Sequence, residues 1–315
     1  MTTFITSFLA QLYASLPFFI LVGLGYFLVR VRKWPSSFTD GLTRFLFNIA
    51  IPVMLFGIMA RFYTQPAVDI RLLFAYFGGS FIVYLIARVI GQKGLKLTGS
   101  EASVFGVGGI FSNNVMLGIP LVSLFIGPEA LPVSALIISF NALLLWSLVS
   151  ISVEWAEHGS PSLRGVFQTF RGVLKNPIVM GVASGLIVSS FHRPLPSFMQ
   201  ETLSMVTDMT APLSLFALGL GLAEYKIADR FKTSLGICFI KLFLHPLIIW
   251  GCAILLDLPP LETKAIVLLG SMAMGMNVYL MARRFRVIEG PVASSLVIST
   301  VASAITTPLI LLLIP

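Results

Sequence analysis

The chain has 315 residues, of which 57% are hydrophobic and 11% charged, and its mean hydropathy is +0.96. Soluble domains carry about 25% charged residues, so this chain has too little charge to cover a water-facing surface. The composition excludes an ordinary soluble enzyme. It also excludes a nucleic-acid-binding protein despite the net charge of +8, because the basic residues form no patch interleaved with aromatics. We expect an all-α integral membrane protein embedded in the lipid bilayer.

Ten stretches are apolar enough to cross a bilayer, which takes about 20 residues. They cover 6–29, 41–60, 71–90, 101–126, 129–153, 176–192, 198–223, 232–255, 261–282 and 290–314. The connections are short, and the longest is 154–175. The first span follows no basic segment and ends at no small-residue cleavage site, so we expect it to be retained rather than removed as a signal peptide.

Basic residues alternate from one connection to the next. The first, third, fifth, seventh and ninth connections with their span ends hold three Lys or Arg each, fifteen of the 21, whereas the others hold four. Cytoplasmic loops of membrane proteins collect Lys and Arg. This pattern places both termini outside the cell membrane, a bacterial inner membrane in our interpretation, and supports the count of ten spans.

An internal repeat relates the two halves of the chain. Identical residues recur at an offset of 160 that drifts to 163, as in Gly25/Gly185, Pro52/Pro212, Phe56/Phe216, Glu101/Glu262, Asn114/Asn277 and Pro128/Pro291. We divide the chain into a first five-helix repeat (1–155), a cytoplasmic linker (156–175) and a second five-helix repeat (176–315). Because five is odd, the second repeat enters the membrane from the opposite side, which is typical of secondary transporters.

Spans 101–126 and 261–282 hold corresponding positions in the two repeats and are predicted to be broken. The first contains four glycines, two adjacent asparagines and Pro120, and the second contains Gly275 and Asn277. Proline removes a backbone hydrogen bond, and glycine and asparagine weaken a helix. Unwound backbone at membrane depth is tolerated only where protein or water satisfies it, and paired broken spans indicate a transporter binding site.

Each broken span would present a half-helix N-terminus, which carries partial positive charge and free N–H groups. A carboxylate could bind there without any Lys or Arg, beside the neutral asparagine amides. Alternatively, these asparagines only satisfy freed backbone groups. The candidate substrate-binding residues are Asn113, Asn114, Asn141, Met276, Asn277 and Tyr279, and the candidate helix-crossing residues are Gly118, Pro120 and Gly275.

Four motifs resemble the auxin efflux carrier family, which includes plant PIN-type carriers and bacterial malonate and malate permeases. They are SNNVMLGIPL (112–121), IPVMLF (51–56), APLSLFALGLGL (211–222) and MARRF (281–285). The resemblance covers nearly the whole chain. It implies ten helices in two inverted five-helix repeats, a scaffold and a transport domain, crossing of broken helices 4 and 9, and an organic anion as substrate.

The resemblance also implies individual roles. In PIN-type carriers an asparagine before the first crossing contacts the substrate, and its match is Asn113. A polar amide upstream of a tryptophan in the fifth span matches Asn141 before Trp146. PIN-type carriers have a second crossing proline where this chain has Val278, so the second crossing would depend on Gly275 and Asn277.

Three ionisable residues inside spans are candidates for ion coupling: Asp208, Lys241 and His245. Asp208 precedes Pro212 by four residues, as its repeat mate Asn48 precedes a proline, so a structural hydrogen bond at the kink is favoured over proton uptake. Lys241 could pair with Asp208, attract the anion, or extend its stem to the interface. His245 is more often a packed donor than a proton relay in such a position.

The sequence therefore predicts a secondary transporter for a small organic anion such as a carboxylate. The alternative is a sodium-coupled symporter of the bile-acid type, although the crossing offers it no acidic ligand; a channel or sensor is less favoured. We expect no enzyme activity, because no nucleophile–base pair or HExxH motif occurs. We expect no cofactor, metal or nucleic-acid partner, and a homodimer remains open.

Overall fold

A computed structural model describes residues 2–64, 68–158, 175–225 and 230–314. The described residues are helical and form no strand, and seven of their helices are long and apolar enough to cross a membrane. The expected all-α membrane protein is therefore confirmed. Three of the ten expected spans are not among the seven, because two are interrupted and the third forms a helix of only 13 residues. The expected linker 156–175 lies almost wholly outside the described residues.

The helices follow one another with short connections. In chain order they are α1 (Thr2–Arg30), α2 (Ser36–Phe45), α3 (Ile51–Ala60), α4 (Arg71–Leu73), α5 (Gly79–Val89), α6 (Gly99–Gly108), α7 (Ile119–Phe125), α8 (Leu131–His158), α10 (Pro177–Ser189), α11 (Ser197–Glu224), α12 (Phe231–Phe239), α13 (His245–Leu255), α14 (Pro260–Ser271), α15 (Asn277–Phe285) and α16 (Glu289–Leu313). Single π-helical turns join several of these into longer rods, at Leu46–Ala50, Phe74–Gly78, Ile90–Gly94, Asn114–Gly118 and Ile240–Leu244.

Three of these π-turns end two residues before a proline. The pairs are Leu46–Ala50 with Pro52, Asn114–Gly118 with Pro120, and Ile240–Leu244 with Pro246. A proline cannot donate to the carbonyl four residues earlier, and its ring collides with that carbonyl. Widening the preceding turn from α to π relieves the collision without ending the rod. The prolines therefore bend these helices at defined depths instead of terminating them.

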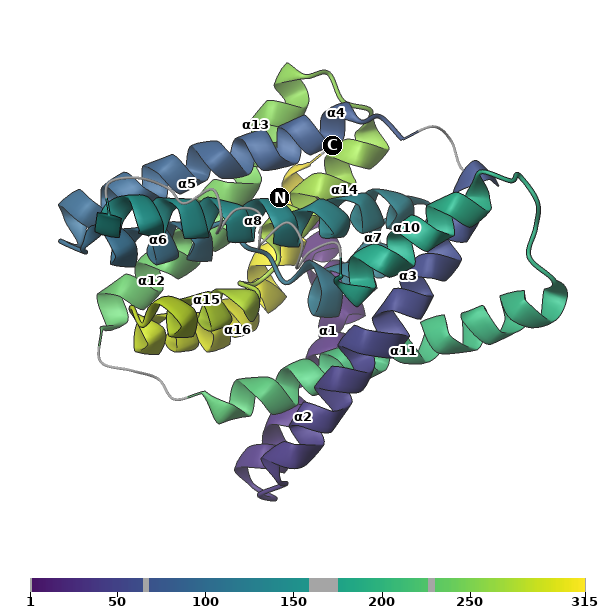
Figure 1. Ribbon diagram of the computed structural model, residues 1–315, viewed down its shortest axis with the longest axis horizontal. Coiled ribbons are helices and arrows are strands. Elements are labelled where there is room, and N and C mark those ends of the chain that lie inside the picture. The colour runs from purple at the N-terminus through teal and green to yellow at the C-terminus, as the bar shows by residue number, and fades with distance from the viewer. Residues whose placement is uncertain (1, 65–67, 159–174, 226–229, 315) are drawn as a thin grey trace.

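The helices form two groups (Figure 1). The small group comprises α1, α2, α3, α10 and α11, with α1 packed along α11 and α10 along α3. The large group comprises α4 to α8 and α12 to α16. Close packing inside the small group depends on glycine: a Cβ on Gly25 would overlap the Phe216 carbonyl oxygen, and one on Gly185 would lie 2.7 Å from the Phe56 carbonyl oxygen. Gly181, one turn before Gly185, allows the same close approach of α10 to α3, because a Cβ there would overlap the Pro52 carbonyl oxygen.

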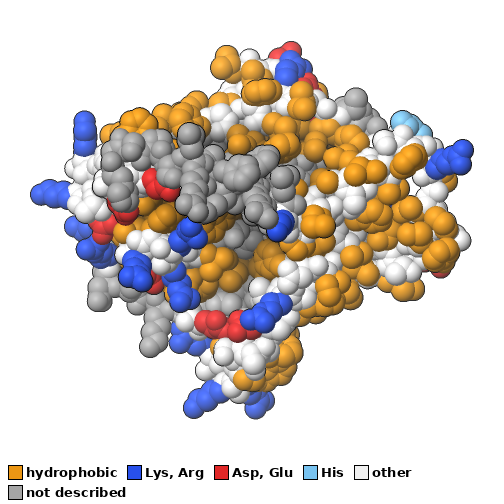
Figure 2. Space-filling view, viewed as in Figure 1, with side chains coloured by type: hydrophobic (Ala, Val, Ile, Leu, Met, Phe, Trp, Pro, Cys, Tyr) orange, Lys and Arg blue, Asp and Glu red, His pale blue; other side chains and the backbone are white. Residues whose placement is uncertain are grey.

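Hydrophobic side chains cover much of the visible surface, most densely on the right-hand side of Figure 2. Large apolar residues such as Tyr13, Phe191 and Leu255 are more than two-thirds exposed. A soluble protein rarely exposes apolar patches of this extent. The outer surface is therefore suited to lipid chains, and polar groups are drawn into the helical interior.

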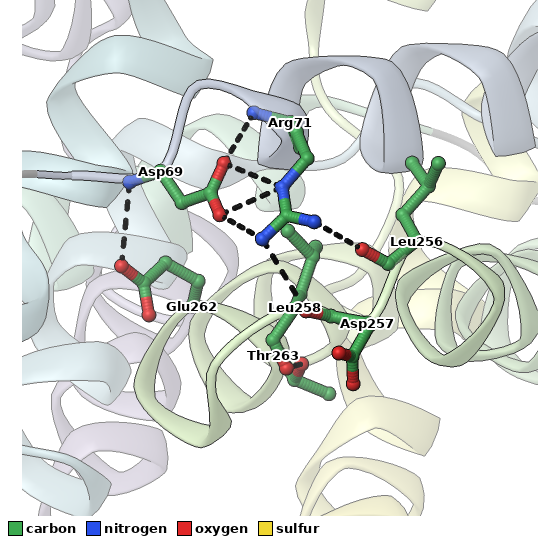
Figure 3. A network of polar contacts seen from close by, with 7 residues as sticks. All are labelled: Asp69, Arg71, Leu256, Asp257, Leu258, Glu262 and Thr263. Atoms are coloured by element: carbon green, nitrogen blue, oxygen red, sulfur yellow. Dashed lines mark hydrogen bonds and ion pairs between the residues drawn. The ribbon is translucent and has the colours of Figure 1, made fainter.

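The first turn of α14 is fixed to the segment before α4 by a polar network (Figure 3). Glu262 accepts a hydrogen bond from the Asp69 backbone N–H at 3.5 Å. Arg71 donates to both carboxylate oxygens of Asp69 and to the Leu256 carbonyl at 3.0 Å. Hydrogen bonds from Arg71 lower the pKa of the Asp69 carboxyl. The network anchors the N-terminal end of α14, and the other end of α14 enters the helical interior.

Candidate substrate-binding site

Two helices break at the same place inside the large group. One rod runs from α6, which ends at Gly108, to the π-turn that begins at Asn114 and continues into α7. The other stops at Ser271, the end of α14, and resumes at Asn277, the start of α15. The two open segments are neighbours in space although more than 150 residues separate them in sequence. The predicted breaks in both spans are therefore present.

The open segments pair through their backbones. Asn113 N–H donates to the Ala273 carbonyl at 2.9 Å, and Gly275 N–H donates to the Phe111 carbonyl at 2.8 Å. Together they form an isolated antiparallel bridge. A Cβ on Gly275 would lie 3.1 Å from the Ser112 carbonyl oxygen, so the absence of a side chain at Gly275 permits this approach. Each break satisfies part of the backbone that the other leaves free.

Side chains complete the first break from within its own half of the chain. The Asn113 Oδ1 accepts from the Met116 N–H at 3.3 Å and so caps the helix that follows. The Tyr76 hydroxyl, on the π-turn before α5, lies 3.1 Å from Asn114 Nδ2 and 3.4 Å from Ser112 Oγ. Tyr76 fixes the orientation of the Asn114 amide, and sequence reasoning did not single it out.

The second break is held from α16. Ser299 Oγ accepts from the Met274 N–H at 3.1 Å, and Thr307 Oγ1 donates to the Ser271 carbonyl at 3.3 Å. Neither residue stands out in the sequence, because a run of small residues on a helix gives the same pattern when it only allows close packing. Val278, which replaces the proline of PIN-type carriers, does not prevent the break.

A pocket of about 760 Å³ lies between the two helical groups and reaches the crossing. From the small group it is lined by residues of α2, the following π-turn and α10, and from the large group by the two breaks, α8 and α15. Five of the six candidate substrate-binding residues and one crossing residue line it: Asn113, Asn114, Asn141, Met276, Asn277 and Gly275. A pocket between two bodies is the usual position of a small-molecule site.

Three asparagines in this pocket are buried and keep an unpaired polar atom. Their exposed fractions are 7% for Asn113, 2% for Asn114 and 5% for Asn141. Within the described structure, Asn113 Nδ2, Asn114 Oδ1 and Asn141 Oδ1 have no hydrogen-bond partner. A buried polar atom without a partner is costly, so these amides are prepared to bind a polar ligand.

Two half-helix N-termini also meet at the pocket, one at Asn114 and one at Asn277. Each N-terminus carries about half a positive charge. The helix α15 begins without a side-chain cap at Met276. The deep end of the pocket thus combines positive helix ends with neutral amides, which suits an anion.

The remaining candidates lie beside the pocket rather than in it. Tyr279 stacks edge-on against Tyr225, with ring centroids 4.7 Å apart, and is not a lining residue. Gly118 and Pro120 are buried behind the first break, where a Cβ on Gly118 would lie 2.9 Å from Leu269. These residues shape the crossing without facing the cavity.

Two arginines line the pocket and were not predicted to do so. Arg44 lies in the last turn of α2, and Arg284 in the last turn of α15. Helical spacing could have identified both, since Arg284 is seven residues after Asn277 and Arg44 is four residues before Asn48, another lining residue. Binding of a carboxylate without Lys or Arg at the crossing stays a prediction, and the pocket that reaches the crossing is also lined by these two arginines.

Of the three candidates for ion coupling, Lys241 and His245 lie together and Asp208 lies apart from them. Lys241 is fully buried, and its ammonium donates to the Gly270 carbonyl and lies 3.0 Å from His245 Nδ1. His245 Nε2 lies 2.9 Å from Ser80 Oγ. Asp208 is exposed on α11. Lys241 therefore neither pairs with Asp208 nor extends to the interface, because its stem is enclosed and the end of α14 supplies its partner.

Ser80 determines the state of the histidine ring. The Ser80 hydroxyl donates to the Tyr76 carbonyl at 2.7 Å, so its oxygen accepts from His245 Nε2–H. His245 Nδ1 then carries a free lone pair and accepts a hydrogen bond from Lys241 Nζ. Among the described residues no carboxylate takes part in this cluster.

Comparison with known proteins identifies the family of the chain. A family model described as "Membrane transport protein" matches residues 12–311. A protein of Rhizobium meliloti (strain 1021) named "Putative malonate transporter" is 27% identical over 305 residues, which cover 95% of this chain and 94% of that protein. The resemblance to auxin efflux carriers is confirmed. The chain belongs to this membrane transport family of auxin efflux carriers, and it is a transporter rather than an enzyme.

Proposed function

We propose that this protein is a secondary transporter for a small organic anion, a carboxylate bound where the two broken helices cross. The observation that carries the proposal is the buried, unpaired donor Asn113 Nδ2 beside two positive helix ends. The unpaired oxygens of Asn114 and Asn141 accept hydrogen bonds and so face a donor rather than a carboxylate oxygen. Asn277 and Met276 complete the site from the second break. The name of the bacterial relative makes malonate the first substrate to test.

Alternating access would arise from movement of the large group past the small group. The pocket lies between them, so sliding would close it on one side of the crossing and open it on the other. The lining residues Arg284, Asn176 and Glu154 belong to helix ends at basic or linker connections. In the orientation that the charge pattern predicts, with both termini outside a bacterial inner membrane, this pocket faces the cytoplasm.

Swapped contacts support the two inverted five-helix repeats. Gly25 and Phe56 are repeat mates of Gly185 and Phe216, and Gly25 packs on Phe216 while Gly185 packs on Phe56. A two-fold relation between halves requires such reciprocal pairs. At the crossing, Ser112 pairs with Met274, which lies 162 residues later in the chain. The repeat mates on either side, Glu101/Glu262 and Asn114/Asn277, are 161 and 163 residues apart.

The sodium-symporter alternative has less support. The described lining of the crossing contains no acidic residue; Glu154 lines the pocket from the end of α8. The carbonyl at the end of α14, a natural cation ligand, is occupied by Lys241. We propose instead that the Lys241–His245 pair beside the Gly270 carbonyl holds an exchangeable proton if transport is proton-coupled. Asp208 then has only a surface role.

The test is malonate binding and uptake by purified protein and by Asn113→Asp. The aspartate keeps the oxygen that caps Met116 but replaces the unpaired amide nitrogen with a negative charge. We expect an unchanged melting temperature and loss of malonate binding by at least about tenfold, the effect of an unfavourable buried charge contact. Asn113→Ala should also lose binding but with lower stability because the cap is lost. Wild-type affinity in Asn113→Asp would remove Asn113 from the site.

A further inference from the structure

A buried polar cluster is attached to the end of the second break. The Lys241 ammonium donates to the carbonyl of Gly270, in the last turn of α14, just before that helix is interrupted. Lys241 Nζ also lies 3.0 Å from His245 Nδ1. Both side chains are fully buried. A positive charge on this pair is therefore held at the C-terminal end of one broken helix, where the helix dipole is negative.

The same cluster reaches the first break through Ser80 and Tyr76. His245 Nε2 lies 2.9 Å from Ser80 Oγ, and the Ser80 hydroxyl donates to the Tyr76 carbonyl at 2.7 Å. The rings of His245 and Tyr76 also pack edge-on, with centroids 5.9 Å apart. The Tyr76 hydroxyl accepts from Asn114 Nδ2 at 3.1 Å. A continuous series of contacts thus joins Lys241 to a buried residue that lines the substrate pocket.

No carboxylate balances the charge on Lys241 within the described residues. The elements packed against Lys241 and His245 are the π-turn of Tyr76 and α5, α12, α13, α14 and α16. Their other titratable or charged side chains are Tyr84, Arg88, Lys232, Cys238, Cys252, Glu262, Lys264 and Glu289. In the part of the chain that the structure describes, none of these hydrogen-bonds or forms an ion pair with Lys241 or His245. A buried ammonium without a counter-ion is costly.

An anion at the crossing would supply the missing negative charge. Opposite charges attract more strongly in a protein interior than in water. Anion binding therefore favours the protonated form of the Lys241–His245 pair, and protonation of the pair favours anion binding to the same extent, because coupling between two sites is reciprocal. When the anion leaves, the proton passes to water, and a neutral amine and a neutral imidazole remain.

We propose that the protein is a proton–anion symporter, in which the Lys241–His245 pair takes up a proton when the anion binds. Tyr76 is the positioning residue that connects this pair to the Asn114 amide. The inference rests on the proposed function and goes further, because it gives the coupling ion, the direction of coupling and a role for Tyr76. Sodium is not needed, because the ammonium of Lys241 already binds the carbonyl at the end of α14.

The experiment measures the protons that are taken up when malonate binds. Purified wild type and variants are mixed with malonate in weakly buffered solution between about pH 6 and 8, where a pH indicator records proton uptake and calorimetry records binding. Lys241→Gln keeps an N–H donor for the Gly270 carbonyl but cannot titrate. Tyr76→Phe keeps the ring beside His245 but loses the hydroxyl that holds Asn114.

The matched control is Lys232→Gln. It makes the same substitution on the same helical rod, but Lys232 is exposed in the first turn of α12. Melting temperatures of the purified variants establish that each is folded. In a second measurement, proteoliposomes with an acid-outside pH gradient are supplied with labelled malonate in sodium or in choline buffer.

We expect wild type to take up protons, at most one for each malonate bound. Lys241→Gln should take up none and should bind malonate roughly tenfold more weakly, because a positive charge beside the anion is lost. Tyr76→Phe should bind malonate more weakly and take up fewer protons, because the connection to the first break is lost. Lys232→Gln should match wild type. The pH gradient should drive malonate accumulation equally well in sodium and in choline.

Malonate binding by wild type without proton uptake, or equal uptake by wild type and Lys241→Gln, would overturn the assignment while leaving the anion transporter intact. A requirement for sodium would overturn it as well. If Lys241→Gln does not fold, Tyr76→Phe decides, since wild-type proton uptake and affinity there would contradict the connection between the cluster and the crossing. Failure of wild type to bind or carry any organic anion would reject the proposed function itself.

Discussion

The two breaks at the crossing both interrupt a helix with non-helical backbone, although their sequences differ. The first has Asn113 as a cap and Pro120 two residues beyond a π-turn. The second has Val278 in place of a proline and is held by Ser299 and Thr307 of α16. One break is built into its own segment, and the other is imposed by a neighbouring helix. A broken span therefore need not contain a helix breaker of its own where another helix satisfies its backbone.

Separating the breaks should have the largest effect. Gly275→Val adds atoms where even a Cβ lies 3.0 Å from the Phe111 ring and 3.1 Å from the Ser112 carbonyl. We expect loss of transport and a strongly lowered melting temperature, measured in proteoliposomes and detergent. Gly251→Val on α13 is the control, because a Cβ there meets nothing within 4 Å. Normal transport by Gly275→Val would show that the close approach is dispensable.

Removing the support from α16 should affect the second break alone. Ser299→Ala leaves the buried Met274 N–H without its acceptor, which costs about 1–3 kcal/mol. Thermal or denaturant unfolding measures this cost. Ser303→Ala provides the comparison, since Ser303 is equally buried but donates only to Thr300 of its own helix. Equal stability of the two variants would mean that Ser299 does not hold the break.

Giving the second break a proline should change little. Val278→Pro falls in the first turn of α15, where proline is tolerated, and removes only the bond from Val278 N–H to the Gly275 carbonyl at 3.1 Å. We expect transport to persist and unfolding free energy to change by no more than about 1 kcal/mol. Leu268→Pro, in the middle of α14, should instead prevent folding. Loss of transport in Val278→Pro would contradict the equivalence of the two breaks.

The smallest expected effect is a change in melting temperature caused by the ion pair beside the first turn of α14. Arg71 lowers the pKa of the exposed Asp69 carboxyl through hydrogen bonds, so the ionised form is favoured in the folded protein. A lowered folded-state pKa contributes stability above the unfolded value of about 3.9 and loses it as the pH falls below that. Asp69→Asn should therefore melt slightly below wild type at pH 7, and the difference should shrink as the pH falls through the lowered pKa of Asp69. A constant difference across this range would remove the ion pair as the cause.

Much of the crossing could be predicted because its signals are local. Glycine, proline and asparagine change backbone preferences wherever they occur, so 101–126 and 261–282 were correctly expected to break. Contacts between distant elements could not be predicted. Such contacts depend on how the helices are rotated against one another. Examples are the contacts of Tyr279 with Tyr225, Ser299 with Met274 and Lys241 with Gly270.

The arginines of the pocket show the same limit. Their positions on helix faces relative to Asn48 and Asn277 follow from sequence spacing, but only the packing of the small group against the large group brings Arg44 and Arg284 into one cavity. Arg44 falls inside the expected span 41–60, and no sequence motif relates it to Arg284. A binding pocket continues along the helices that form it. Residues at helical spacing from a predicted break are therefore candidates for the pocket lining.

The most direct test of the central claim is an experimental structure with malonate bound at saturating concentration. We predict one carboxylate within hydrogen-bond distance of the Asn113 amide and the start of α15 at Asn277, with both helices interrupted as described. Continuous helices through 109–113 and 272–276, or malonate bound away from this crossing, would contradict the account.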